Sequence, residues 1–219
     1  MYIRRMVDNR PNPDSIRERY LNRISQYGHS EDSLGWRKST AIHRYLAVSR
    51  IVNQVHPANV LDIGTGFGDL LRILRSNDWS GRFVGLDLVQ EFVKVAIELA
   101  EKDSLAEFRC VDEILEFQNY RTDFAVALGL LNHVSTKNAE FRLEFLEKML
   151  SVSRVGFAVD FLCSSANRKT DDLIYQDSQL LIDWANQNHL RWRIDHSYLR
   201  YEFLFVIEKG NSGTEDFSY

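Results

Sequence analysis

The stretch VLDIGTGFGDLLRIL at residues 60–74 decides the fold, because it has the pattern of a strand, a glycine-rich turn and a helix in succession. Gly64, Gly66 and Gly68 let the backbone turn sharply and let a ligand approach without meeting a Cβ atom. The turn also delivers the N-terminus of a helix, whose free N–H groups favour a carboxylate or a phosphate. We therefore predict a ligand-binding turn at the carboxyl end of a strand.

The chain around this turn alternates short apolar runs with amphipathic helices. Several runs are apolar at successive positions, which is typical of strands in a parallel sheet covered by helices on both faces. The predicted strands are 60–63, 82–88, 106–111, 124–128 and 155–161, and the predicted helices are 67–76, 89–102, 138–150 and 177–188. The closely spaced runs 190–198 and 200–208 predict an antiparallel hairpin. The fold class is therefore α/β, a doubly wound, Rossmann-like three-layer sandwich.

We divide the chain into an N-terminal arm and helical cap at 1–57, one α/β domain at 58–209 and a flexible polar tail at 210–219. Asp14 or Ser15 is expected to cap the first helix, and Gly28 to close it. Ser39 or Thr40 is expected to cap a second helix that ends at Pro57.

The composition narrows the class of partner. The 219 residues include 27 Lys and Arg against 31 Asp and Glu, a net charge of −4, which makes nucleic acid an unlikely partner because duplex binding rests on neutralising phosphates. Two cysteines are too few for a disulfide framework, and the histidines lack metal-ligand spacing, so no metal site is predicted. No run approaches about 18 apolar residues. We expect a soluble cytoplasmic protein without a membrane segment.

Acidic residues at two predicted strand ends indicate the type of ligand. Asp87 follows Gly66 by 21 residues, the spacing at which a carboxylate reaches ribose hydroxyls, and it can also cap the following helix. Asp69 stands where a dinucleotide-binding turn has its third glycine, and an acid there repels a pyrophosphate but can accept from an ammonium group. The strand end CVDEI offers Asp112 or Glu113 to an adenine amino group and Ile114 to its face. These features favour S-adenosylmethionine over a nicotinamide dinucleotide.

With these motifs the chain resembles the class I S-adenosylmethionine-dependent methyltransferases. The resemblance covers about residues 58–208, and the motifs that carry it are LDIGTGFGDL (61–70), GLDL (85–88), CVDEI (110–114), FAVALGLLNHV (124–134) and YEFLFVIE (201–208). The stretch YGHSEDSLGWRKSTAIHRY at 27–45 is similar to a segment that precedes this turn in some small-molecule methyltransferases. The resemblance implies a seven-stranded sheet whose last strand is antiparallel, and methyl transfer to an O, N, S or C nucleophile.

The resemblance also implies roles for single residues. It places Gly64, Thr65, Gly66 and Asp69 around the methionine moiety, Asp87 on the ribose, Leu88, Asp112, Glu113 and Ile114 around the adenine, and Leu128 and Gly129 near the sulfonium.

Candidate groups for the acceptor side follow the fourth strand and precede the first. His133 is the candidate general base, because it lies where substrates approach and has a pKa near neutrality, although a helix-capping role is an alternative. Asn132 could orient a substrate carbonyl or hydroxyl. Trp36, Arg37 and Arg44 are expected over the cofactor cleft, with Trp36 walling the active site and Arg44 pairing with the cofactor's carboxylate.

We expect an enzyme that methylates an O or N nucleophile of a small metabolite or natural-product intermediate. The oligomeric state is left open. Three alternatives remain: a methyltransferase acting on a protein or RNA side chain, a catalytically silent cofactor-binding scaffold, and a nicotinamide oxidoreductase. The NPPY-type tetrad of nucleic-acid amino methyltransferases is missing, since the fourth strand runs into LGLLNHV. Asp69 and the terminal hairpin disfavour the oxidoreductase.

Overall fold

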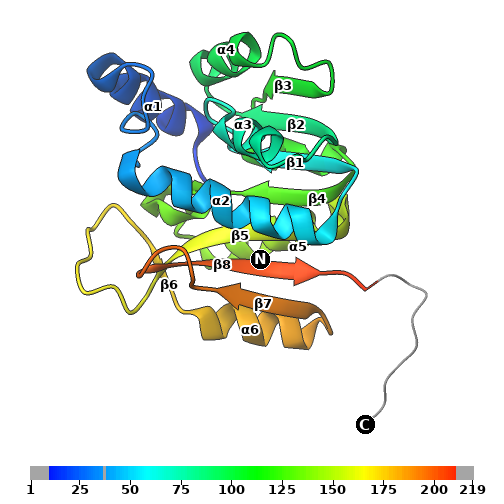
Figure 1. Cartoon of the computed structure of the whole chain (residues 1–219). Coiled ribbons are helices and arrows are strands. Elements are labelled where there is room, and N and C mark those ends of the chain that lie inside the picture. Colours follow the sequence, from blue (N-terminus) through cyan, green and yellow to red (C-terminus); the bar gives the residue numbers. More distant parts are fainter. Residues whose placement is uncertain (1–9, 37, 211–219) are drawn as a thin grey trace, which may run out of the picture.

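An eight-stranded sheet forms the centre of the computed structural model, which describes residues 10–36 and 38–210 (Figure 1). The strand order is β3-β2-β1-β4-β5-β8-β7, and β6 pairs with β5 outside this path. The strands are β1 (Asn59–Ile63), β2 (Arg82–Asp87), β3 (Ala106–Cys110), β4 (Thr122–Ala127), β5 (Ser153–Cys163), β6 (Tyr175–Gln176), β7 (Arg191–Asp195) and β8 (Glu202–Glu208).

Helices cover both faces of the sheet. The α-helices are α1 (Pro13–Tyr27), α2 (Lys38–Val55), α3 (Asp69–Ser76), α4 (Gln90–Leu99), α5 (Ala139–Val152) and α6 (Ser178–Gln187), and the 3-10 helices are η1 (Ile114–Asn119), η2 (Leu130–Asn132) and η3 (Val134–Thr136). Side chains of α2, α3 and α4 join the apolar cluster on one face, and those of α5 and α6 join the cluster on the other. The predicted three-layer α/β sandwich is confirmed.

The strand β8 illustrates why its sequence is apolar at successive positions. Phe203, Phe205 and Ile207 belong to one core cluster, while Leu204 and Val206 belong to the cluster on the opposite face. Because both faces of the strand are covered, both sets of side chains are buried. Alternate residues of one strand therefore hold the two helix layers to the sheet.

The carboxyl-terminal part of the sheet differs in detail from the expectation. β8 runs antiparallel to both β5 and β7, so the predicted hairpin is confirmed, but six residues, 196–201, connect its strands. The two-residue strand β6 adds an eighth strand to the seven that were expected. The segments 1–9 and 211–219, which fall in the predicted arm and tail, lie outside the described residues.

The helix α1 lies beside the edge at which β2 and β4 end (Figure 1). Asn12 caps it, in place of the predicted Asp14 or Ser15, because its Oδ1 accepts the N–H groups of both residues. Gly28 ends the helix with a φ of 65°. None of its residues is fully buried. α1 therefore covers the sheet edge without being part of the core.

No helix in residues 10–36 and 38–210 combines the length and the apolar character that crossing a membrane requires.

Candidate active site

A cavity opens at the carboxyl ends of β1, β2 and β4 and is covered by α1. The cavity and its open mouth together enclose about 930 Å³. Ten of the predicted site residues line it, namely Trp36, Gly64, Thr65, Gly66, Asp87, Leu88, Ile114, Leu128, Gly129 and His133. The predicted residues Arg44, Asp69, Asp112, Glu113 and Asn132 are outside the lining.

The glycine turn approaches neighbouring side chains closely. Gly66 has a φ of 55°, and a Cβ atom at this position would lie 3.0 Å from Leu34 Cδ2. The N–H groups of Gly64 and Thr65 both donate to the Leu86 carbonyl, at 2.8 and 2.9 Å. These backbone hydrogen bonds join the turn after β1 to the end of β2.

Asp87 connects the glycine turn to α4. Its Oδ2 accepts the Gly66 N–H at 2.8 Å, and its Oδ1 accepts the Val89 N–H at 2.9 Å. Burial raises the pKa of Asp87 to about 6, although these backbone hydrogen bonds act in the opposite direction. The carboxylate thus supports the turn and the start of the helix from a position in the cavity wall.

Asp62 supports the same turn from behind and was not singled out from the sequence. Thr65 Oγ1 donates to Asp62 Oδ2 at 2.8 Å. Burial raises the pKa of Asp62 to about 7, against the effect of the Thr65 hydrogen bond, and the charge of Asp87 adds to the rise. The signal that could have revealed it is an acid inside an otherwise apolar strand.

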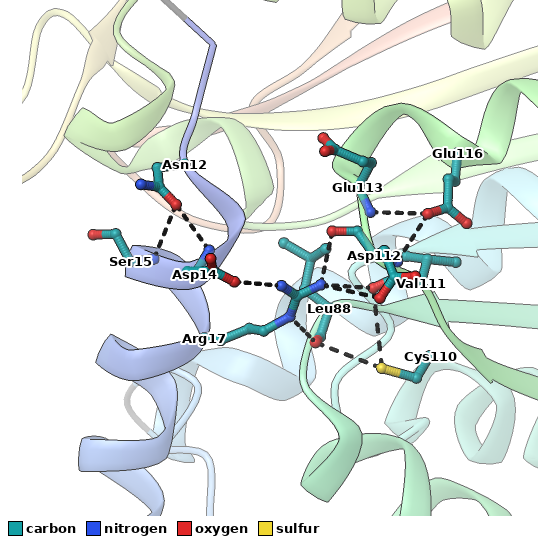
Figure 2. Close-up of polar contacts among 10 residues, drawn as sticks. All are labelled: Asn12, Asp14, Ser15, Arg17, Leu88, Cys110, Val111, Asp112, Glu113 and Glu116. Atoms are coloured by element: carbon teal, nitrogen blue, oxygen red, sulfur yellow. Dashed lines mark hydrogen bonds and ion pairs between the residues drawn. The ribbon is translucent and has the colours of Figure 1, made fainter.

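Arg17 fastens α1 to the ends of β2 and β3 (Figure 2). Its guanidinium donates to the carbonyls of Leu88, Val111 and Asp112, at 3.1, 3.2 and 2.7 Å. It also donates to Asp14 Oδ1 at 2.8 Å. This clamp brings three residues of α1 to the cavity wall that the sequence did not predict: Ile16, Arg19 and Tyr20. The sequence feature that could have indicated these residues is the helical spacing of Ile16 and Tyr20.

Two acids predicted to flank the adenine point elsewhere. The Asp112 side chain is fully exposed; its backbone carbonyl accepts from Arg17 at 2.7 Å, and its Oδ1 lies 3.7 Å from the same guanidinium (Figure 2). Glu113 and Glu116 form a capping box for η1, in which Glu116 Oε1 accepts the N–H groups of Asp112 and Glu113. Of the four residues predicted around the adenine, Leu88 and Ile114 are therefore the two that line the cavity.

Asp69, predicted near the methionine moiety, also lies outside the cavity lining. It stands in the first turn of α3, and its Oδ1 accepts from Arg72 at 2.9 Å. A local ion pair at a helix start accounts for its position.

Arg44 pairs with two buried acids, whereas the sequence predicted that it would pair with the cofactor's carboxylate. Its Nε donates to Glu202 Oε2 at 2.7 Å and lies 3.6 Å from Asp160 Oδ2. The guanidinium also lies 4.8 Å from the centre of the Trp36 ring. Trp36 stands in the cavity wall, whereas Arg44 is behind it. Arg37, the third residue expected there, is outside the described residues.

Asn132 is turned toward β5. Its Oδ1 accepts the Leu162 N–H at 3.1 Å, and its Nδ2 lies 3.5 Å from Asp160 Oδ1. Asp160 Oδ1 also accepts the Gly129 N–H at 2.5 Å. Asn132 therefore ties the loop after β4 to β5 and does not reach the cavity.

His133 lines the cavity and caps η3 at the same time. Its Nδ1 accepts the Ser135 N–H at 3.1 Å and lies 2.9 Å from Ser135 Oγ. Burial lowers the pKa of His133, the positive charge of Arg19 lowers it further, and Asp172 acts in the opposite direction. Since a backbone N–H can only donate, Nδ1 is an acceptor and the neutral ring carries its proton on Nε2. Both the predicted cavity position and the alternative capping role are present.

Within residues 10–36 and 38–210, no group of three His, Cys, Asp or Glu side chains is placed to hold a metal ion.

Known proteins share both the sequence pattern and the architecture. Residues 60–156 match the family model described as a methyltransferase domain. The methyltransferase-named protein Rv1506c of Mycobacterium tuberculosis is 29% identical over 169 residues, covering 74% of this chain and 99% of that protein. The protein-lysine N-methyltransferase EFM4 of Saccharomyces cerevisiae is 28% identical over 125 residues, covering 53% of this chain and 55% of that protein.

Among solved structures, the magnesium protoporphyrin IX methyltransferase ChlM of Synechocystis PCC 6803 has the same fold. It superimposes with a TM-score of 0.66 at 12% identity, over 90% of this chain and 100% of that chain.

Proposed function

We propose that this chain, a class I S-adenosylmethionine-dependent methyltransferase, transfers a methyl group to an oxygen or nitrogen nucleophile of a small molecule. The observation that carries the proposal is the cavity between the glycine turn and α1, which combines a glycine-rich backbone turn, a buried carboxylate and apolar walls. S-adenosylmethionine supplies a methyl group that is already electrophilic because it is bonded to a sulfonium.

The residues in the cavity wall fit this cofactor. Gly64 and Gly66 present backbone without a Cβ atom, which suits the methionine moiety. Asp87 presents a carboxylate at the strand end, which suits the ribose hydroxyls. Leu88 and Ile114 offer apolar surface for the adenine, and Leu128 and Gly129, which also line the cavity, would border the sulfonium. The chain's own contribution to catalysis is then mostly alignment of the nucleophile and exclusion of water.

The enclosure of the cavity by side chains supports the proposal that the methyl acceptor is a small molecule. α1 supplies Ile16, Arg19 and Tyr20 to the wall, and Leu34 and Trp36 complete it. A long flexible side chain of a protein could still enter through the mouth, and the likeness to a protein-lysine methyltransferase makes a protein amine the second candidate.

Calorimetry with S-adenosylmethionine, S-adenosylhomocysteine and NADH tests the cofactor, and a metabolite panel against a peptide panel tests the acceptor. We expect binding of both methionine derivatives and turnover of small molecules. Binding of NADH but of neither methionine derivative would refute S-adenosylmethionine as the cofactor. Turnover of lysine peptides alone would establish the second candidate.

A further inference from the structure

The acceptor side of the cavity holds one cation. Arg19 is the sole Lys or Arg among the described residues that line the cavity. Its guanidinium carbon lies 5.2 Å from the centre of the Tyr20 ring, and no carboxylate within residues 10–36 and 38–210 is at ion-pair distance from it. The half-buried guanidinium also forms a side-chain hydrogen bond with Tyr20, and its remaining donors are available to a ligand.

The second polar group on this side, His133, is a donor. Its Nδ1 is occupied by the Ser135 N–H, so the neutral ring presents an N–H at Nε2. Nε2 has no hydrogen-bond partner among the residues that the structure describes. In this arrangement the ring cannot take a proton at Nε2, and Nδ1 is already used.

No acid replaces His133 as a base. Of the described residues lining the cavity, Asp87 is the one carboxylate, and both of its oxygens accept backbone N–H groups. Asp62 and Asp160 are buried behind the wall, on Thr65 and Gly129. The hydroxyl of Thr136 donates to the His133 carbonyl at 2.8 Å. Asp172, whose charge acts on both His133 and Arg19, lies outside the cavity lining and is hydrogen-bonded with Thr170. Among the described residues that line the cavity, the acceptor side therefore offers donors and a positive charge, and none of its groups is free to remove a proton.

Resting on the proposed function, we propose that the methyl acceptor is an ionised carboxylate, held by the Arg19 guanidinium and the His133 Nε2–H. One carboxylate oxygen forms a bond to the methyl carbon while the S–CH3 bond breaks and leaves its electron pair on sulfur. The products are a methyl ester and neutral S-adenosylhomocysteine. No proton is released, so the reaction needs no base.

The chemistry of the site selects a carboxylate from other nucleophiles. A carboxylate is ionised at neutral pH and carries one charge, which matches the charge of Arg19, the one Lys or Arg among the described lining residues. Its planar pair of oxygens fits the fork of a guanidinium. An amine or an alcohol would need a base at neutral pH, and a phosphate would bring up to two charges to a single arginine.

The first experiment measures acceptor binding to the protein loaded with S-adenosylhomocysteine. Aromatic and aliphatic monocarboxylates are titrated beside the corresponding primary amides, with wild type, Arg19→Met and Arg72→Met. Arg72 is an exposed arginine outside the cavity and serves as the matched control. We expect carboxylates to bind roughly tenfold or more tightly than their amides, and this preference to disappear only in Arg19→Met. A carboxylate series that neither binds nor is methylated overturns the proposal.

The second experiment separates three roles of His133 by its amide variants. Gln keeps a donor near Nε2, whereas Asn keeps an acceptor near Nδ1 for the Ser135 N–H, and neither is a base. We expect Gln to retain carboxylate methylation and Asn to lose it by roughly tenfold or more. Equal loss in both variants would indicate a base, and retention by Asn alone would indicate a capping role; either result contradicts the proposal.

Measuring cofactor affinity distinguishes failure of this inference from failure of the proposed function. If Arg19→Met weakens S-adenosylmethionine binding as much as carboxylate binding, Arg19 holds the cofactor and this inference fails while the methyltransferase function stands. If wild-type protein binds neither methionine derivative, the proposed function itself fails.

Discussion

The Gly66 N–H donates to Asp87 Oδ2 at 2.8 Å, which joins the glycine turn after β1 to the acidic end of β2. One carboxylate therefore shapes the turn that is proposed to receive the methionine moiety, and the same carboxylate is proposed to bind the ribose. Asp87 is thus held in position by backbone N–H groups of the protein itself.

Replacing Asp87 by alanine should weaken S-adenosylmethionine binding by about 1–3 kcal/mol, roughly 5- to 150-fold, because hydrogen bonds to a charged group are lost. Isothermal titration calorimetry measures the change. Asp112→Ala is the control, since that side chain is fully exposed and outside the cavity lining, and its affinity should stay at the wild-type value. Equal losses in the two variants would argue against the ribose role of Asp87.

The Arg17 clamp predicts a second effect on binding. Arg17→Met removes charge-assisted hydrogen bonds to three carbonyls, so α1 should loosen, with faster amide exchange over 13–27 and S-adenosylmethionine affinity reduced by about 1–3 kcal/mol. Hydrogen exchange and calorimetry give the two measurements. Asp14→Ala removes one of the two exposed ion pairs of the same arginine, the other being with Asp112, and should have little effect. Slow exchange retained in Arg17→Met would mean that apolar packing alone holds the helix.

Asp62 predicts an unusual pH dependence of stability. Its pKa is about 7 in the folded protein because of burial and near 4 when unfolded, so the folded state binds more protons between these values. Its ionisation therefore lowers the free energy of unfolding as pH rises from about 4 to about 7. Asp62→Asn should be more stable than wild type above pH 7, and this advantage should vanish near pH 4, as judged by urea denaturation.

Asp103 provides the control of opposite sign for Asp62. The hydrogen bond from Arg75 lowers its pKa, so its contribution to stability is present at neutral pH and is lost as pH falls below about 4. Asp103→Asn should be less stable than wild type at pH 7. A pH-independent difference between Asp62→Asn and wild type would contradict the assigned pKa.

Arg44 predicts a large effect on stability and a small one on cofactor binding. Arg44→Met leaves Glu202 and Asp160 buried beside no cation and should cost about 3–5 kcal/mol of unfolding free energy. Arg82→Met breaks an exposed pair with Glu107 and should cost at most about 1 kcal/mol. Denaturant titration compares the two. Reduced S-adenosylmethionine affinity with unchanged stability would instead support the sequence-based role of Arg44 at the cofactor.

The succession of strands and helices along the chain and the position of the turn could be predicted because they depend on local patterns. Residues 60–63 are apolar at nearly every position and precede three closely spaced glycines, and β1 covers Asn59–Ile63. The short strand β6 has no comparable pattern, since two residues carry no periodicity, and it forms only by pairing with the end of β5.

Several predicted site residues lie outside the cavity, for reasons that the spacing of residues in the sequence does not reveal. Arg44 meets Glu202, 158 residues later in the chain, because β8 lies beside β5 in the folded sheet. Glu113 is drawn into a capping box because η1 begins at the next residue. Conversely, Arg19 reaches the cavity because the Arg17 clamp orients α1. The contacts of Arg17 with backbone carbonyls cannot be predicted from a sequence pattern.

The place of β8 between β5 and β7 has a consequence for synthesis on the ribosome. Residues 202–208 follow every other strand in the chain, yet they occupy an interior position of the sheet. Until that segment emerges from the exit tunnel, the nascent polypeptide exposes a long apolar edge along β5, an opportunity for aggregation that chaperones would need to shield.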